Sequence, residues 1–288
     1  MIEALSNHEN STICWNTVKL FLPKCKKEKD MNEQSAISRE DQELFWSKLA
    51  YFFGAWLGDG WYSWNPYNRV YSVGIKCMDH EIISKCFLDV SMCITDLKPH
   101  RYQETTEKGT VLDKLIWYNQ KFTGFVVMAT AAKTKIPDFI WEADKQTKLN
   151  FLAGLMDTDG TILKQANKDC RDGFFYRLSF SGTKGFVTQF PDLLRILRIK
   201  TIGKQVEEHI NPNHARRLIV SISLPSAIQA GFKFYCRRKQ DRLDDAIERS
   251  KTRYVTMTNT RFGSKVPSET IRRTTDIVED IVQHCEKL

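Results

Sequence analysis

Apolar and polar residues follow one another along this chain in segments whose spacing changes between helical and strand-like. Over residues 42–53 the apolar residues recur every three or four positions, which predicts a helix with one buried face. From Val70 to Cys77 they recur at every second position, which predicts a strand with one buried face. The first half continues as a helix, two strands and a helix, expected at residues 79–95, 97–105, 111–119 and 122–132.

The second half repeats this order of elements. Strands are expected at residues 161–164, 175–181, 201–208 and 215–223, with helices at 145–158, 184–199 and 226–232. The similar stretches Tyr71–Ile75 and Tyr176–Phe180 begin 105 residues apart, so the repeat is internal and long. The pattern therefore predicts two related half-domains, each with the order helix, two strands, helix, two strands, helix.

Each half begins with an apolar run of small residues that ends in Asp-Gly. The runs are Phe52–Gly60 (FFGAWLGDG) and Leu152–Gly160 (LAGLMDTDG), and their last aspartates, Asp59 and Asp159, lie 100 residues apart. An apolar run followed by a carboxylate and a glycine predicts a buried helix that presents one carboxylate at its C-terminal end. A single copy would be explained by a helix-ending turn, whereas two matched copies favour a shared site.

Small residues at helical spacing predict that the two helices pack closely. Gly54 and Gly58 lie four positions apart, as do Gly154 and Thr158, and residues four apart share one helix face. Such packing would bring the two aspartates side by side, where like charges repel unless they are compensated. Oxygen ligands without nearby His or Cys favour a hard cation such as magnesium. Metal ions held there would activate water and stabilise the leaving oxygen in phosphodiester hydrolysis.

Composition limits the class of binding partner and the cellular compartment that the sequence suits. The chain has 43 Lys and Arg against 35 Asp and Glu, a net charge of +8 and a pI near 9.0, which suits a polyanion such as nucleic acid. Its eight cysteines show no zinc-ligand spacing. No apolar run reaches the about 18 residues that span a bilayer, and no targeting signal is apparent. We expect a soluble intracellular protein.

Both Asp-Gly runs resemble the dodecapeptide motif of the LAGLIDADG homing endonucleases, in the two-motif, single-chain form related to intein-encoded enzymes. LAGLMDTDG is very similar to the motif, and FFGAWLGDG carries Trp56 and Leu57 in place of Ile-Asp, as in intein-type first motifs. The resemblance covers about residues 42–245. It implies an α+β fold with two pseudo-symmetric αββαββα half-domains. The motif helices would form the interface, and two four-stranded antiparallel sheets would form a saddle over DNA.

On this basis we divide the chain into four parts. Residues 1–40 would be an N-terminal extension and linker, 41–143 and 144–250 the two half-domains, and 251–288 a basic linker with a C-terminal helix.

The resemblance also implies the site residues. Asp59 and Asp159 would be catalytic and would bind Mg²⁺ or Mn²⁺, with Gly58 and Thr158 as further residues of the metal site.

The family also uses one basic residue from each half to assist the attacking water and the transition state. In intein-type members the first precedes an Ile-Pro pair, which here follows Lys133-Thr134-Lys135. The family position falls on Thr134, and we choose Lys135 as catalytic, with Lys133 next. After the last helix of the second half we choose Lys239. Each lysine could instead be a solvated or phosphate-contacting charge.

The polar faces of the strands are expected to contact DNA, because a two-stranded ribbon fits the major groove. Trp61 and Trp64 are expected as core or hinge aromatic residues rather than as platforms for bases. The predicted DNA-contacting residues are Ser72, Lys76, Lys98, His100, Lys114, Arg177, Ser179, Ser181, Arg217, Ser221 and Arg238.

These features together predict a monomeric homing endonuclease that makes a staggered double-strand break at a long site in double-stranded DNA. No membrane and no obligate protein partner is expected. The alternative is a catalytically silent protein of the same fold, either an RNA maturase or a DNA-binding regulator, although the presence of both aspartates weighs against it. A third possibility, an unrelated αβ enzyme, would show no salt-sensitive DNA binding.

Overall fold

The computed structural model describes residues 39–65, 70–166, 174–183, 185–208 and 217–261, and their elements fall into two similar series. The first series holds α2 (Arg39–Asp59), β1 (Gly60–Asn65), β2 (Val70–Cys77), α3 (His80–Cys93), β3 (His100–Thr105), β4 (Val111–Trp117), α4 (Gln120–Ala129) and α5 (Asp138–Glu142). The second series holds α6 (Lys145–Thr158), β5 (Gly160–Ala166), β6 (Phe174–Thr183), the 3-10 helix η2 (Phe186–Gln189), α7 (Phe190–Ile196), β7 (Thr201–Glu208), β8 (Arg217–Ile222), α8 (Leu224–Ala230) and α9 (Arg237–Arg261).

Each series builds one four-stranded antiparallel sheet. The strand order is β1-β2-β4-β3 in the first half and β5-β6-β8-β7 in the second, so both halves have the same connectivity. Gly60 pairs with Ile75, and its repeat counterpart Gly160 pairs with Phe180, so the strand registers also agree. The α+β fold with repeated αββαββα halves, predicted from the residue pattern, is confirmed.

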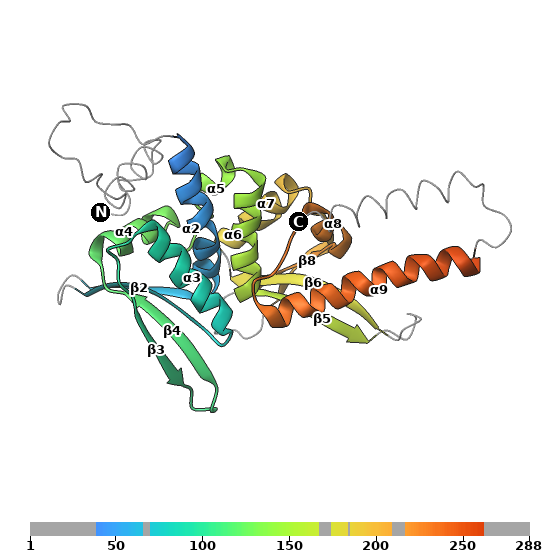
Figure 1. The fold of residues 1–288 in the computed structure, drawn as a ribbon, viewed down its shortest axis with the longest axis horizontal. Helices are drawn as coiled ribbons and strands as arrows, with labels where there is room; N and C mark the ends of the chain where they lie inside the picture. Colours follow the sequence, from blue (N-terminus) through green and yellow to red (C-terminus); the bar gives the residue numbers. More distant parts are fainter. Residues whose placement is uncertain (1–38, 66–69, 167–173, 184, 209–216, 262–288) are drawn as a thin grey trace.

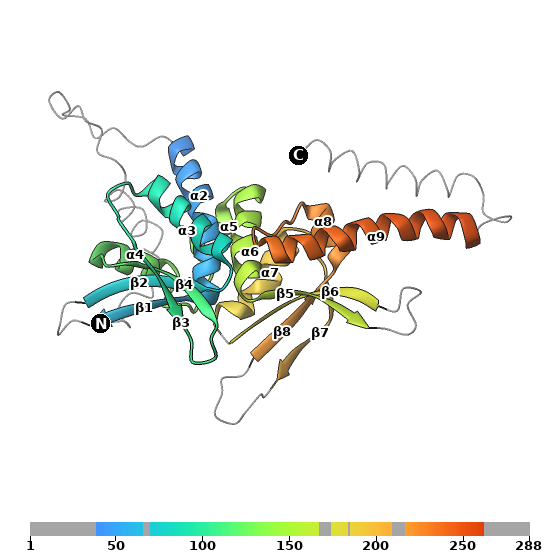
Figure 2. The same ribbon diagram turned by 60° about the horizontal axis from the view of Figure 1, so that its bottom comes forward.

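Helices and sheets form separate layers. Helices α2 and α6 stand side by side at the centre, one from each half, and the strands extend from their lower ends (Figure 1, Figure 2). The strands alternate as predicted, with their apolar residues toward the helices. The helix-facing strand residues that are almost fully buried include Val73, Ile75, Leu115, Trp117, Leu178, Phe180, Val220 and Ile222.

The two motif helices touch along their glycines. A Cβ atom on Gly54 would lie 2.0 Å from the backbone oxygen of Phe151, and one on Gly154 would lie 2.1 Å from that of Tyr51. No side chain fits into such a gap, so the absence of a Cβ is what permits this approach. The helix contact predicted from the spacing of small residues is therefore present, and it is reciprocal between the halves.

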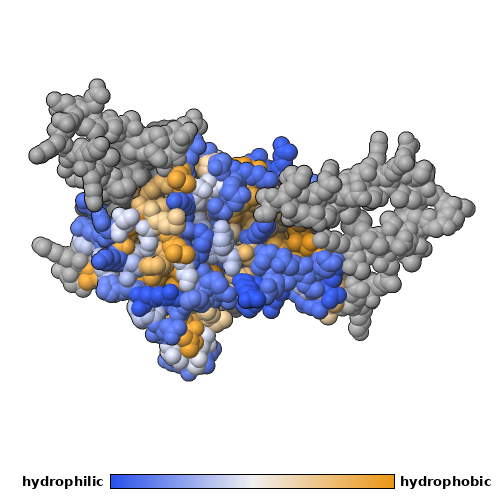
Figure 3. Space-filling view, viewed as in Figure 1, coloured by the Kyte–Doolittle hydropathy of each residue, from blue (hydrophilic) through white to orange (hydrophobic). Residues whose placement is uncertain are grey.

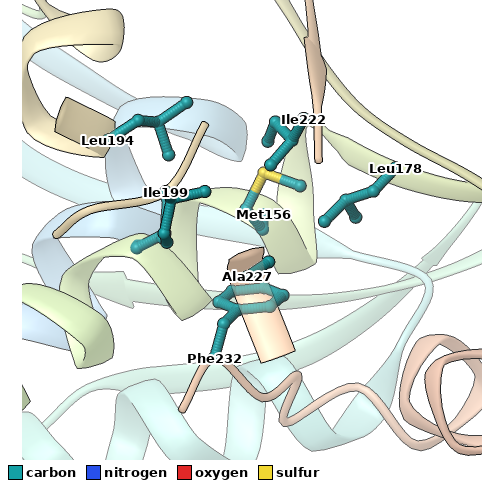
Figure 4. Close-up of a pocket in the computed structure, with 8 residues that line it drawn as sticks. Met156, Leu178, Leu194, Ile199, Ile222, Ala227 and Phe232 are labelled. Carbon is teal, nitrogen blue, oxygen red and sulfur yellow. The ribbon is translucent and has the colours of Figure 1, made fainter. Parts of the chain in front are cut away.

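Apolar side chains fill the space between α6 and the second sheet. Met156, the counterpart of Trp56 in the first motif, lies among Leu178, Ile222 and Phe232 (Figure 4). The other lining residues, Leu152, Leu194, Ile199 and Ala227, are also apolar. This region offers no polar side chain to a ligand and belongs to the core.

The last described helix leaves the body of the protein. Helix α9 runs without a break across the boundary placed at residue 250, and the coloured surface around its first turns is mostly hydrophilic (Figure 3). Residues 1–38 and 262–288, which include most of the predicted N-terminal extension and the predicted C-terminal helix, lie outside the described residues. Within the described part of the chain, no helix is long and apolar enough to cross a bilayer.

Candidate active site

The two motif helices end together, each with its aspartate at or just beyond the last turn. Helix α2 ends at Asp59, and Asp159 follows the last residue of α6 in a helical conformation. A Cβ atom on Gly58 would lie 2.1 Å from Oγ1 of Thr158 and 3.3 Å from the carboxyl carbon of Asp159. The structure therefore brings the four predicted metal-site residues to one place, where both aspartates are half-buried.

Lys133 reaches the end of helix α2 from the loop after α4. Its Nζ donates hydrogen bonds to the backbone oxygens of Gly58, at 2.9 Å, and Gly60, at 2.8 Å. The loop approaches through three consecutive residues with positive φ: Ala131 at 42°, Ala132 at 53° and Lys133 at 71°. Non-glycine residues rarely adopt this region, so the surrounding structure holds the loop in a costly conformation.

Lys239 occupies the corresponding position at the end of helix α6. Its Nζ donates to the backbone oxygens of Met156, at 2.9 Å, Asp157, at 2.5 Å, and Gly160, at 2.7 Å. The residue is only 6% exposed. The last carbonyls of a helix lack partners within the helix and carry its negative dipole end, so a lysine there is stabilising. Each half thus places one lysine beside its Asp-Gly, half-buried in the first half and buried in the second.

Lys135, the first choice from the sequence, lies elsewhere. Its Nζ forms an ion pair with Asp138 Oδ2 at 2.7 Å, one turn away at the surface. The second choice, Lys133, is the residue that the structure places beside Asp59. No sequence signal separates the two lysines, because the loop that presents Lys133 takes its left-handed conformation without glycine.

The charges of the site depend on one another. Burial raises the pKa of the Asp59 carboxyl, while a hydrogen bond from Cys77 and the charges of Lys133 and Lys239 act in the opposite direction. Burial lowers the pKa of the Lys133 ammonium group, and Asp159 and Asp59 oppose that shift. The lysines therefore favour ionised aspartates, as metal binding requires.

Asp157 lies next to the site and was not among the residues predicted from the sequence. It is almost fully buried and accepts hydrogen bonds from Tyr51 Oη (2.9 Å) and from the backbone N–H groups of Tyr235 (3.0 Å) and Cys236 (3.2 Å). Burial raises its pKa to about 6. Its counterpart in the first motif is Leu57, so only the second half anchors its lysine segment in this way. The replacement of Leu57 by Asp157 between the two motifs was the one sequence feature that could have pointed to this residue.

The donor set fits a hard divalent cation. Among the described residues there is no cluster of three or more His, Cys, Asp or Glu side chains that could hold a metal, so coordination would rest on Asp59 and Asp159 with backbone oxygens. Magnesium commonly binds through one or two carboxylates and keeps several waters, so two carboxylates suffice. Gly58 and Thr158 were also predicted as metal-site residues. The backbone oxygen of Thr158 lies 3.4 Å from Lys239 Nζ, and that of Gly58 accepts a hydrogen bond from Lys133.

Most of the predicted DNA-contacting residues share the sheet faces turned away from the helices. Lys76, His100 and Arg177 are exposed there, and Lys114, Ser181 and Ser221 are partly exposed, whereas Ser72 and Ser179 are buried between neighbouring strands. Lys98 is exposed just before β3. Trp61 is half-buried on the same open face, with Lys114 Nζ 6.0 Å from its ring centroid.

Two predicted DNA contacts stand apart from this group. Arg238 lies at the start of α9, where it pairs with Asp79. The side chain of Arg217 lies outside the described residues, although its backbone belongs to β8.

The structure is similar to solved structures of LAGLIDADG homing endonucleases. I-DmoI in complex with DNA and Mn is 15% identical, with a TM-score of 0.45 over 64% of this chain and 94% of that chain. I-WcaI bound to its DNA recognition sequence is 14% identical (TM-score 0.43, 80% and 89%). The meganuclease I-SmaMI bound to uncleavable DNA is 9% identical (TM-score 0.46, 73% and 91%). No family model and no curated protein matches the sequence.

Proposed function

We propose that this chain is a LAGLIDADG-type endonuclease that cuts both strands of a long, asymmetric DNA site with Mg²⁺ or Mn²⁺. The observation that carries the proposal is the meeting of Asp59 and Asp159 at the ends of two helices in glycine-mediated contact, each beside a lysine that bonds to the helix end. A protein that only binds DNA gains nothing from two half-buried carboxylates, because their negative charge repels a polyanion.

The chain's own residues divide the work. Asp59 and Asp159 would hold the metal, which supplies an activated water and charge neutralisation at the leaving oxygen. A lysine ammonium group has three N–H donors. The described acceptors of Lys133 are two carbonyls, so one N–H remains to orient a water or a phosphate oxygen. Lys239 donates hydrogen bonds to three close backbone carbonyls, so its main role is to hold the C-terminal end of α6 in place.

The open sheet faces support DNA as the partner. Lys76 and Lys114 lie directly opposite each other on β2 and β4. Like charges at such positions are destabilising in the free protein, and a bound phosphate backbone removes the cost. Lys114 is also paired with Glu104, which compensates part of it.

The two faces are chemically unlike. By strand register, the positions of Lys76 and Lys114 correspond to Ser181 and Ile219 in the second half, which also pair with each other. Lysine favours guanine and phosphate, whereas an aliphatic side chain suits the thymine methyl group. An asymmetric target follows from this difference, with the lysine pair over one half-site only.

Converting the lysine pair to its second-half counterparts is expected to weaken DNA binding in a salt-dependent way. In Lys76→Ser/Lys114→Ile, the slope of log K against log salt concentration should become shallower by about 2, because each lost phosphate contact removes about 0.9 from it. Fluorescence anisotropy with a labelled duplex over a KCl series measures the slope. The matched control is Lys121→Ser, an exposed lysine on α4. An unchanged slope in the double variant would remove this face from the DNA interface.

The activity itself is tested by cleavage selection from a randomised duplex library, with Mg²⁺ and with a chelator in parallel. We expect double-strand breaks at one related set of sequences, only when Mg²⁺ or Mn²⁺ is present. Enrichment of bound duplexes without breaks in either metal would instead identify a catalytically silent DNA-binding protein.

A further inference from the structure

The segment just before Lys239 belongs to the second half but packs against residues of the first half. The ring of Tyr235 meets the ring of Tyr51 on α2 edge-on, with 4.8 Å between centroids. Lys85 of α3 lies over both rings, 5.0 Å from the centroid of Tyr235 and 5.3 Å from that of Tyr51. These contacts bring the segment before α9 against the helices of the other half.

An ion pair one residue before Lys239 adds a further contact between the two halves. Arg238 donates from Nε to Oδ1 of Asp79 at 3.3 Å and from an Nη to Oδ2 at 3.0 Å. Two parallel bonds fix the direction of the guanidinium group as well as its distance. The Asp79 side chain is 17% exposed and that of Arg238 51%, so the carboxylate is the fixed partner. Asp79 itself immediately precedes α3 of the first half.

The ion pair therefore sets where α9 begins. The backbone N–H groups of Lys239 and Gln240 both donate to the Cys236 oxygen, which closes the first turn around Arg238. Within the second half, Asp157 holds the preceding backbone at Tyr235 and Cys236. Among the described residues, Asp79 is the acidic residue of the first half that forms an ion pair with this turn.

The lysine segment of the first half is held differently. After Lys133, the backbone N–H of Ile136 donates to Oε1 of Gln189 in the second half, at 2.9 Å. That bond is neutral and lies three residues beyond the lysine. Each half thus holds the lysine segment of the other half. The first half does so through an ion pair next to Lys239, and the second half through a hydrogen bond to an amide, three residues from Lys133.

We propose that Asp79 is a positioning residue for Lys239, through Arg238, and that it supports cleavage of one DNA strand more than the other. The inference rests on the proposed nuclease function. Asp79 does not touch the reacting atoms; it holds in place the residue next to the lysine at the end of α6. In this assignment Arg238 serves the protein's own active site, whereas a DNA contact was expected from the sequence.

The test is single-turnover cleavage of a duplex from the selection, with each strand labelled separately. In Asp79→Asn we expect one strand to be cut about 10- to 100-fold more slowly, because a misplacement of about 1 Å near the chemistry costs up to that much. The other strand should change by less than about threefold, so nicked DNA should accumulate. Asp192→Asn, which breaks the exposed Asp192–Arg195 pair on α7, is the matched control and should not change the strand ratio.

A double-mutant cycle separates positioning from DNA contact. Arg238→Met should produce the same strand bias, and the double variant Asp79→Asn/Arg238→Met should be no slower than either single one, because both remove one interaction. Multiplying effects would mean that Arg238 acts on DNA and would overturn the inference. So would equal slowing of both strands in Asp79→Asn. Failure of the wild-type protein to cut either strand would refute the nuclease function instead.

Discussion

Asp159→Asn is expected to abolish double-strand cleavage while leaving DNA binding nearly intact. The carboxylate stands beside Gly58 at the junction of α2 and α6. In the proposed mechanism its charge would help to hold the metal. Loss of metal-assisted charge stabilisation is worth several kcal/mol, which is about a 1000-fold or greater fall in rate. Asp59→Asn should behave in the same way, because the two aspartates occupy equivalent positions in the repeat.

Binding should survive these substitutions because Asn has nearly the same shape and the positive sheet faces are untouched. Removing a negative charge near phosphate reduces repulsion, so any change in affinity should be toward tighter binding. Plasmid cleavage and anisotropy on the same preparations measure both properties, with the exposed Asp96→Asn as the control variant. Robust cutting by the Asp159→Asn protein would show that the paired aspartates are not the catalytic carboxylates.

Lys133→Met is expected to slow cleavage about 100-fold, the usual cost of removing a donor from a charged transition state. The ammonium group sits at the carbonyls of Gly58 and Gly60, next to Asp59, and retains one N–H beyond its described acceptors. Lys135→Met should change the rate by less than about twofold, because an exposed ion pair such as Lys135–Asp138 contributes little.

The two lysine variants control for each other. They remove the same charge from the same short loop, so a general effect of net charge on DNA binding appears in both. Because Lys133→Met leaves two carbonyls unpaired, thermal unfolding should accompany the kinetics, which are compared where both variants are folded. A large loss in Lys135→Met with a normal rate in Lys133→Met would return the catalytic assignment to Lys135.

The order of elements was predictable because it depends on local periodicity and a repeat. The alternation around Ile75 and around Leu178 marked strands with one buried face, and the glycines of the motifs marked helices in contact. Those features belong to neighbouring residues in the sequence, and the structure confirms them. The course of α9 past residue 250 was missed because the segment from residue 251 is rich in Thr and basic residues and was interpreted as a linker.

The site could be predicted only as far as the motifs reach. The choice between Lys133 and Lys135 depends on three left-handed residues that no glycine marks. The partner of Arg238 is Asp79, which lies 159 positions away, and the buried role of Asp157 depends on Tyr51 from the other half. Such contacts arise from the packing of the two halves, which residue spacing does not encode.

A metal shared by the ends of α2 and α6 is tested most directly by mapping its position on the protein. Fe²⁺ in place of Mg²⁺, with ascorbate and peroxide, generates radicals that cut the polypeptide beside the bound ion. With DNA bound, we predict fragments ending near residues 58–60 and near residues 158–160, both lost in Asp59→Asn/Asp159→Asn. Fragments that map elsewhere, or that persist unchanged in the double variant, would contradict a metal site built from these two aspartates.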